Sequence, residues 1–298
     1  MSGSSYDPRT RLPIAIRDVP FQQQHGGEPL LARVYQPQGP GPFPALIDVH
    51  GGAWSAGDRT QNELTDTALA ESGVVVVAVD FRLAPAHPYP AQVQDVNLAT
   101  RWLKTHAAEF NASPEGIGGL GTSSGAHTVA LSAMRPFDPR YAALPLPENP
   151  AADARLSYLL LLWGVLDPFA RYQFALPLRG PRGEQQPGTV GHLATNTEGY
   201  FLTEAAMQEG NPQEMLDRGE PVELPPALIL QGFPDSNIPK GIPERFTESY
   251  RNAGGHVEIE WFPGSPHGFM RRPGPPTDRA LELARGFIAR QLAGVGAG

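Results

Sequence analysis

Short apolar runs alternate with amphipathic helical patterns along most of the chain. Several runs are apolar at every position, so strands formed from them must be covered on both faces, as in a helix-covered parallel sheet. The six runs are residues 45–49, 74–79, 117–120, 156–162, 227–231 and 257–262. This alternation predicts an α/β architecture with a mostly parallel sheet and helices on both faces.

Helical patterns occupy the segments between these runs. Each places its apolar residues on one stripe, and Pro or Gly marks several of the ends. The predicted helices are residues 91–108, 124–134, 244–253 and 278–292. Near the start of the chain, the runs 14–21 and 30–36 flank two glycines and predict an antiparallel hairpin.

One long segment, residues 167–223, interrupts the alternation. It places about 55 residues between two predicted strands, far more than an ordinary connection needs. Its Pro-, Gly- and Gln-rich part, 179–191, is expected to be loose, and its later part has aromatic and helical content. The segment is either a surface insertion that covers a helix or a cap over an active site. We therefore divide the chain into a catalytic domain, 1–166 with 224–298, and a cap or lid insertion, 167–223.

A G-x-S-x-G pattern, Gly121 to Gly125, lies between the predicted strand 117–120 and the predicted helix 124–134. A sharp strand-to-helix turn strains the backbone at the central serine and leaves room only for small neighbours. This context predicts that Ser123 is an exposed nucleophile. An ordinary glycine-rich turn is the alternative.

A second glycine motif, His50-Gly51-Gly52-Ala53-Trp54, follows the run 45–49. Glycines after a strand let backbone N–H groups approach a ligand closely. In acyl transfer, such groups bind the oxyanion together with the N–H of the residue after the nucleophile. The predicted donors are Gly51, Gly52, Ala53 and Ser124. We expect His50 to be a buried hydrogen-bonding residue that shapes this loop.

A serine nucleophile needs a base, and the base needs an orienting carboxylate. His267 lies on the loop after the last predicted strand, where a strand end would deliver it to Ser123, and is the predicted base. His127 lies four residues along the nucleophile's own helix and is expected to be structural. Asp235 and Asp167 both follow strands, where ligand sites form in open α/β sheets. We favour Asp235 as the acid and interpret Asp167 as a turn residue at the start of the insertion.

Together, these segments resemble the α/β-hydrolase superfamily. Within it, they resemble carboxylesterases related to hormone-sensitive lipase and to feruloyl-esterase-like and arylformamidase-like hydrolases. The segments that carry the resemblance are 50–54, 79–85 with His87 and Pro88, 121–125, 224–226 and 267–269. The resemblance implies an eight-stranded sheet whose second strand is antiparallel, and no cofactor. The sequence has no pattern of metal ligands, so we expect no metal. Asp80 and Arg82 belong to the pattern and are expected to fix a loop, with Asp95 as a candidate partner.

The expected activity is hydrolysis of carboxylic esters of small or aromatic substrates, through the triad of Ser123, His267 and Asp235 and an acyl-enzyme. Two alternatives remain open, an arylformamidase-type amide hydrolase and a non-catalytic binding protein of the same fold. Four aromatic residues are candidates for the substrate pocket, with core packing as the alternative for Trp54, Phe201 and Phe269. The four are Trp54, Tyr200, Phe201 and Phe269.

Composition excludes several other classes. The 31 acidic residues outnumber the 23 basic ones, which disfavours binding to phosphate backbones of nucleic acids. The chain has no cysteine, so thiolate nucleophiles and cysteine-based metal sites are excluded. Its apolar runs are far shorter than the ~20 residues of a membrane-spanning helix, and because residues 1–11 are polar we expect no signal peptide within them. We expect a cytoplasmic enzyme with a small-molecule ester substrate, and leave association as a homodimer open.

Overall fold

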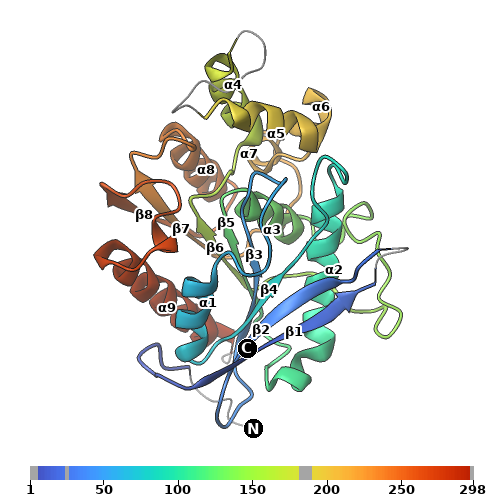
Figure 1. Ribbon diagram of the computed structural model, residues 1–298, viewed down its shortest axis with the longest axis vertical. Helices are drawn as coiled ribbons and strands as arrows, with labels where there is room; N and C mark the ends of the chain where they lie inside the picture. The colour runs from blue at the N-terminus through green and yellow to red at the C-terminus, as the bar shows by residue number, and fades with distance from the viewer. Residues whose placement is uncertain (1–5, 24–26, 181–189, 296–298) are drawn as a thin grey trace.

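A computed structural model describes residues 6–23, 27–180 and 190–295 of the chain. In it, eight strands form one sheet in the order β1-β2-β4-β3-β5-β6-β7-β8 (Figure 1). The strands β3 to β8 pair in parallel, whereas β2 pairs antiparallel with both β1 and β4. The predicted α/β-hydrolase fold is therefore confirmed, including the antiparallel second strand.

The strands lie close to the predicted runs. They are β1 (Ile14–Gln22), β2 (Leu30–Pro37), β3 (Ala45–Val49), β4 (Val75–Val79), β5 (Gly118–Thr122), β6 (Tyr158–Leu162), β7 (Ala227–Phe233) and β8 (Val257–Pro263). β5 and β7 each continue two residues beyond the predicted run, and at β5 this extension enters the glycine-serine motif. Gly121 and Thr122 keep an extended backbone there, so the turn is confined to Ser123.

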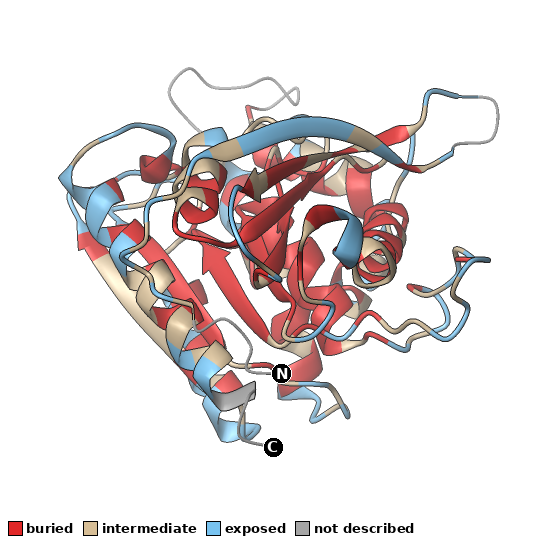
Figure 2. Cartoon of the chain, turned by 90° about the horizontal axis from the view of Figure 1, so that it is seen from below, coloured by how far each residue is buried: buried red, intermediate tan, exposed pale blue. Residues whose placement is uncertain are grey.

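Each face of the sheet packs against its own set of helices. The pattern is clear at β4, because Val75, Val77 and Val79 belong to one apolar core while Val76 and Ala78 belong to the other. The first core includes residues of α2 (Ala91–His106), α3 (Ser124–Met134) and α8 (Gly241–Asn252). The second includes residues of α1 (Glu63–Glu71) and α9 (Pro275–Val295). The sheet is buried between these layers, whereas β1 is largely exposed (Figure 2).

The helix α1 was not predicted from the sequence. Its nine residues bury Thr65 and Asp66 as well as Leu69 and Ala70, so no apolar stripe marks it. Short 3₁₀ turns also occur at Ala107–Phe110, Leu176–Leu178 and Phe269–Arg271.

The segment 167–223 is mostly helical where it is described. It contains α4 (Pro168–Ala175), α5 (His192–Phe201), α6 (Glu204–Glu209) and α7 (Pro212–Asp217). The helices α4 to α6 lie at one end of the molecule, yellow in Figure 1, whereas α7 packs against α3 and α8. Most of the stretch 179–191, expected to be loose, lies outside the described residues.

Candidate active site

Ser123 occupies the turn between β5 and α3. Its backbone has φ 53° and ψ −118°, a combination that residues with a Cβ rarely adopt. Two hydrogen bonds hold this geometry, from Ser123 N to Leu162 O at 3.0 Å and from Val165 N to Ser123 O at 3.0 Å. The strained turn that the motif predicts is therefore present.

The glycines of the motif are required by close backbone contacts. A Cβ on Gly125 would lie 2.0 Å from Val49 O, and one on Gly121 would lie 2.6 Å from Ala126 Cα. Both distances are shorter than any real Cβ contact, so only glycine fits. The contact at Gly125 brings the end of β3 against the start of α3, which sets the glycine loop after β3 beside Ser123.

The structure brings Ser123, His267 and Asp235 together. His267 Nε2 lies 3.0 Å from Ser123 Oγ, and His267 Nδ1 lies 2.9 Å from Asp235 Oδ2 and 3.1 Å from Asp235 Oδ1. The three residues follow β5, β8 and β7 respectively. These strands are parallel and end at the same edge of the sheet. An ionised carboxylate only accepts hydrogen bonds, so Nδ1 carries the ring hydrogen and Nε2 is free to accept from the serine hydroxyl.

Asp235 is held from several directions. Its side chain is 1% exposed and accepts hydrogen bonds from Asn237 N at 2.8 Å, Ile238 N at 3.1 Å and Gln231 Nε2 at 2.9 Å. These donors fix the carboxylate's orientation and leave it facing the imidazole.

Asp167, the other candidate acid, has a different role. It caps α4, where Oδ1 accepts from Ala170 N at 2.9 Å and from Asn211 Nδ2 at 2.9 Å. Its second oxygen lies 3.4 Å from Arg245 Nη1. The structure thus does not bring Asp167 to His267, and it supports the interpretation of Asp167 as a turn residue.

The loop after β3 has three consecutive residues with positive φ, at Gly52 (113°), Ala53 (50°) and Trp54 (62°). A Cβ at Gly52 would lie 1.9 Å from Ala56 O, so this position requires glycine. Within the described parts of the chain, the N–H groups of Gly52 and Ala53 have no hydrogen-bond acceptor. Trp54 N donates to Ser124 Oγ at 3.2 Å, which joins the loop to the helix after the nucleophile.

The structure confirms the expectation for His50. It is buried, its Nδ1 hydrogen-bonds Gly51 O at 2.7 Å, and its ring stacks on Phe81 at 4.2 Å. Burial lowers the pKa of His50, which keeps the ring neutral.

The loop after β4 is fixed by two ion pairs. Arg82 donates to Asp95 through Nε at 2.9 Å and through its backbone N at 2.9 Å, as expected from the sequence. Asp80 instead accepts from Arg59, at 2.8 Å from Nη1 and 2.9 Å from the backbone N.

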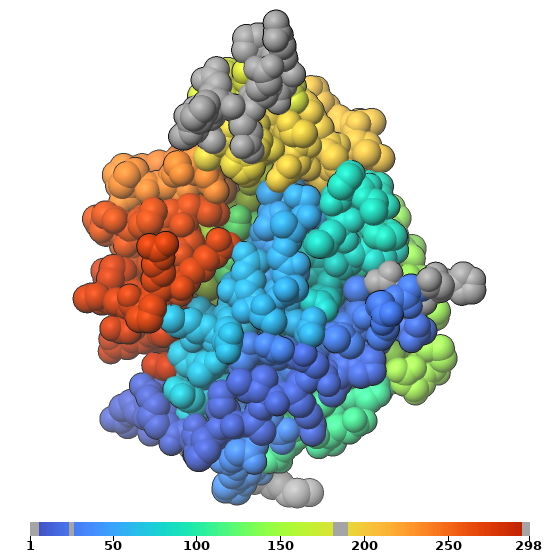
Figure 3. Space-filling model, viewed as in Figure 1, coloured from blue at the N-terminus to red at the C-terminus, as the bar shows by residue number. Residues whose placement is uncertain are grey.

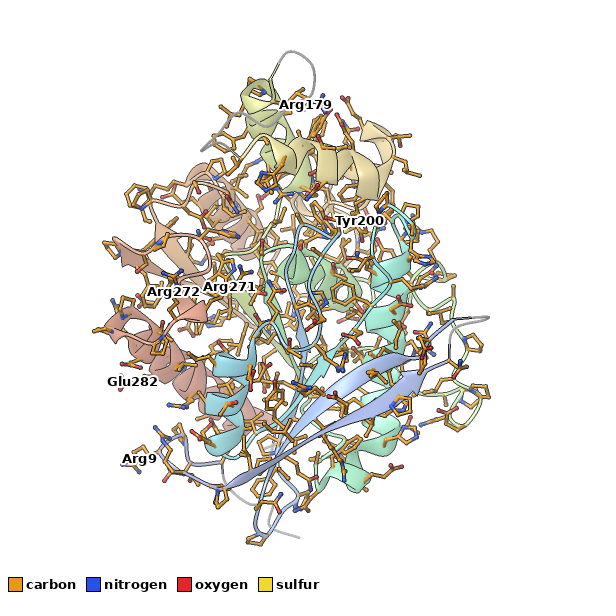
Figure 4. The ribbon with its side chains drawn as sticks, in the orientation of Figure 1. Arg9, Arg179, Tyr200, Arg271, Arg272 and Glu282 are labelled. Carbon is orange, nitrogen blue, oxygen red and sulfur yellow. The ribbon has the colours of Figure 1, made fainter. Side chains whose placement is uncertain are left out.

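The aromatic residues predicted to line a substrate pocket are mostly buried, which corrects that expectation. Trp54, Tyr200 and Phe201 are 1%, 0% and 2% exposed and pack together between the loop after β3 and the insertion. The rings of Trp54 and Tyr200 stack at 4.9 Å with planes 3° apart (Figure 4 labels Tyr200). Leu202, the next residue, is 65% exposed. The structure therefore favours the packing alternative for these side chains.

Phe269 also packs in a core. Its ring lies 4.8 Å from that of Phe262 and 5.4 Å from that of Trp163, in the core shared with α9. Its 9% exposure again favours packing over substrate contact. Sequence reasoning passed over Trp163, which has φ 40° and lies 6.3 Å from the His267 ring, because no motif marks it.

Open space adjoins the histidine loop. A cavity of about 530 Å³ is lined by residues of 264–277, including His267 and Arg271. In the space-filling view, a furrow separates the orange and red C-terminal part from the light-blue segment that follows β3 (Figure 3).

None of the helices in the described ranges is both long and apolar enough to cross a membrane.

Comparisons with known proteins agree with this architecture. The BD-FAE family model matches residues 33–155. A probable carboxylic ester hydrolase of Mycobacterium tuberculosis, LipM, is 31% identical over 71% of this chain and 46% of its own length. Esterase LipI of the same organism is 27% identical over 93% of this chain and 86% of its own length. The chain thus spans only about half of LipM.

Solved esterase structures share the fold. A Pyrobaculum calidifontis esterase has a TM-score of 0.74 and 24% identity, with 94% of this chain and 85% of that chain covered. A butyrate-bound Thermogutta terrifontis esterase has a TM-score of 0.70 and 22% identity, with 93% and 94% covered. With the order of the motifs along the sequence, these similarities place the chain in the α/β-hydrolase superfamily, among relatives that are carboxylic ester hydrolases.

Proposed function

We propose that this chain is a serine hydrolase that cleaves carboxylic esters of small or aromatic substrates. The observation that carries the proposal is the hydrogen-bonded series from Ser123 Oγ through His267 to Asp235. Its distances match those needed for a nucleophile, its base and an orienting acid. The names of the curated relatives support ester hydrolysis as the reaction.

In the proposed reaction, His267 Nε2 takes the hydroxyl proton as Ser123 Oγ attacks the ester carbonyl carbon. Asp235 stabilises the imidazolium that forms. The tetrahedral intermediate collapses, the bond to the alcohol oxygen breaks, and His267 returns the proton to the leaving alcohol. Water then attacks the acyl-enzyme by the same route and releases the acid and free Ser123.

The oxyanion of the intermediate needs N–H donors that have no other partner. Gly52 and Ala53 supply two such groups, and Ser124 N lies at the first residue of α3, where helix N–H groups lack intrahelical acceptors. Gly51 is the fourth candidate. The partial positive charge at the start of α3 favours negative charge at the same place.

A short acyl group fits this proposal best. The Thermogutta terrifontis esterase of similar fold was solved with butyrate bound. Acetate to butyrate esters, with p-nitrophenol or simple alkyl alcohols, are therefore the first substrates to test.

The test compares wild type with Ser123→Ala on p-nitrophenyl acetate and on a panel of alkyl and aryl esters. Without the nucleophile, kcat should fall by roughly 10⁴-fold or more while the circular dichroism spectrum stays unchanged. Activity of the pure variant within tenfold of wild type would refute the proposal. Turnover of aryl formamides with no turnover of any ester would move the assignment to an amide hydrolase.

A further inference from the structure

His127 is a buried histidine on the helix that begins right after Ser123. It is 0% exposed, and both ring nitrogens have partners from other parts of the chain. Trp54 Nε1 donates to His127 Nδ1 at 3.1 Å, and His127 Nε2 lies 2.8 Å from Gly210 O. A carbonyl only accepts, so Nε2 carries the ring hydrogen and Nδ1 is the acceptor for the indole.

The imidazole therefore bridges two segments that are far apart in sequence. Trp54 belongs to the loop with the proposed oxyanion donors, and Gly210 lies between α6 and α7 of the insertion. Burial lowers the pKa of His127 to about 4, so the neutral ring that both contacts need is kept at ordinary pH.

The insertion also contacts the Trp54 side chain directly. Tyr200 of α5 stacks on the indole, and the Arg171 guanidinium of α4 lies 4.9 Å from the indole centroid. Arg171 is 1% exposed, and Thr197 Oγ1 at 3.2 Å is its side chain's one hydrogen-bond acceptor among the described residues. The aromatic face of Trp54 therefore contributes to the stabilisation of this buried cation, together with the electrostatic attraction of Asp235.

The Trp54 backbone is fixed as firmly as its ring. Its carbonyl accepts from Gln92 Nε2 at 2.6 Å and from Ala84 N at 3.0 Å. Trp54 directly follows Ala53, and both residues have positive φ. This backbone conformation persists only where the surrounding structure holds it. The direction of the Ala53 N–H therefore depends on how Trp54 is held.

We propose that His127 is a positioning residue for the reaction. It acts through Trp54, so that the insertion holds the oxyanion loop, which is the segment 51–54 with the proposed oxyanion donors. This inference rests on the proposed ester hydrolysis. His127 does not touch the reacting atoms. The oxyanion forms only on the way to the tetrahedral intermediate, so a displaced loop lowers kcat and changes KM little.

The test uses His127→Leu, which removes both hydrogen bonds, and His127→Gln, whose amide keeps one acceptor and a donor. On p-nitrophenyl acetate, His127→Leu should lower kcat by roughly 10- to 100-fold, less than the roughly 10²- to 10³-fold loss of a whole oxyanion donor. KM should stay within about threefold, and His127→Gln should recover at least a third of the wild-type kcat.

A matched control exists elsewhere on the chain. His106 and Trp102 both lie on α2, whereas Ser123 precedes α3. His106 Nδ1 hydrogen-bonds Trp102 O at 2.9 Å, and the two rings stack with centroids 5.0 Å apart. His106→Leu should lower the melting temperature without changing kcat. If His127→Leu likewise changes only the melting temperature, His127 is a packing residue and the inference is wrong. Should His127→Leu not fold, Trp54→Phe removes the same hydrogen bond and takes its place.

A second readout separates this inference from the proposed function. Reaction of Ser123 with a fluorophosphonate also places an oxygen in the oxyanion loop, and it requires no ester turnover. Its rate should fall in His127→Leu in parallel with kcat and recover in His127→Gln. A wild type that reacts with the fluorophosphonate but cleaves no ester would refute the proposed function, and the variant rates would still decide the inference. No reaction in wild type would overturn both.

Discussion

Asp235 and Asp167 occupy equivalent positions, each just beyond the C-terminal end of a parallel strand. Their different roles follow from the donors around them. Backbone and amide donors orient the Asp235 carboxylate but leave one side to the imidazole. The oxygens of Asp167 are used by the first turn of α4, by Asn211 and by Arg245. The type of residue and its place in the topology do not separate the two, whereas the hydrogen-bond donors around each carboxylate do.

This difference predicts opposite results for two matched substitutions. Asp235→Asn presents an amide to His267, favours the wrong tautomer and should lower kcat by roughly 10³- to 10⁴-fold. Asp167→Asn keeps an oxygen for the Ala170 N–H and should change kcat less than about threefold, with a lower melting temperature because the contact with Arg245 weakens. Steady-state kinetics on p-nitrophenyl acetate and thermal unfolding decide the matter. The reverse order of effects would assign the acid to Asp167.

At the scale of the elements, the sequence predicted best where a residue's neighbours in the chain determine its environment. Ser123 was identified because a strand, a small-residue turn and a helix are consecutive in the sequence. For Trp54 the sequence left a pocket role and core packing both open, and it assigned Tyr200 to the pocket, because an aromatic side chain on a loop or a short helix fits a cleft and a core equally well. The partners of His127 are 73 and 83 residues away, so no local pattern could reveal them.

The buried aromatic cluster changes the expectation for Phe201. Its ring lies 5.5 Å from that of Trp54, 5.4 Å from that of Tyr89 and 4.7 Å from that of Tyr200. Phe201→Ala should therefore lower the free energy of unfolding by about 3–5 kcal/mol, as for other buried phenylalanines. The order of preference among acyl chain lengths should not change. Urea unfolding and the ester panel on one preparation test this, and a changed preference at unchanged stability would support the pocket role.

At the scale of the whole molecule, the interior also contains a pair of buried carboxyl groups. Asp48 of β3 and Asp66 of α1 interact in the interior, where they are 1% and 0% exposed. Asn62 Nδ2 donates to both oxygens of Asp48 at 3.0 Å, while the Asp66 oxygens have no donor among the described residues. Burial raises the pKa of both carboxyl groups because it penalises their charged forms.

The sign of the resulting pH dependence follows from proton counts. An unfolded Asp loses its proton near pH ~3.9, whereas the folded pair keeps protons to higher pH. The folded state therefore binds more protons between these values, and the free energy of unfolding should fall as pH rises from about 5 to 8. Asp66→Asn removes one titrating group, so its stability should fall less over the same range. Urea unfolding at both pH values tests this, with the exposed Asp278→Asn as the control. An unchanged pH slope in Asp66→Asn would contradict the prediction.

The topology has a consequence for when the protein becomes reactive during synthesis. Ser123 precedes His267 by 144 residues, and the loop of His267 follows β8, which lies at the edge of the sheet beside β7. The hydrogen bonds that hold the turn at Ser123 come from Leu162 and Val165, so a nascent chain completes this turn only after β6. The serine hydroxyl still has no base until the ribosome has released β8 and the loop of His267 and this strand has paired. Chemical competence thus arises last, so covalent labelling of Ser123 counts only molecules whose sheet is complete.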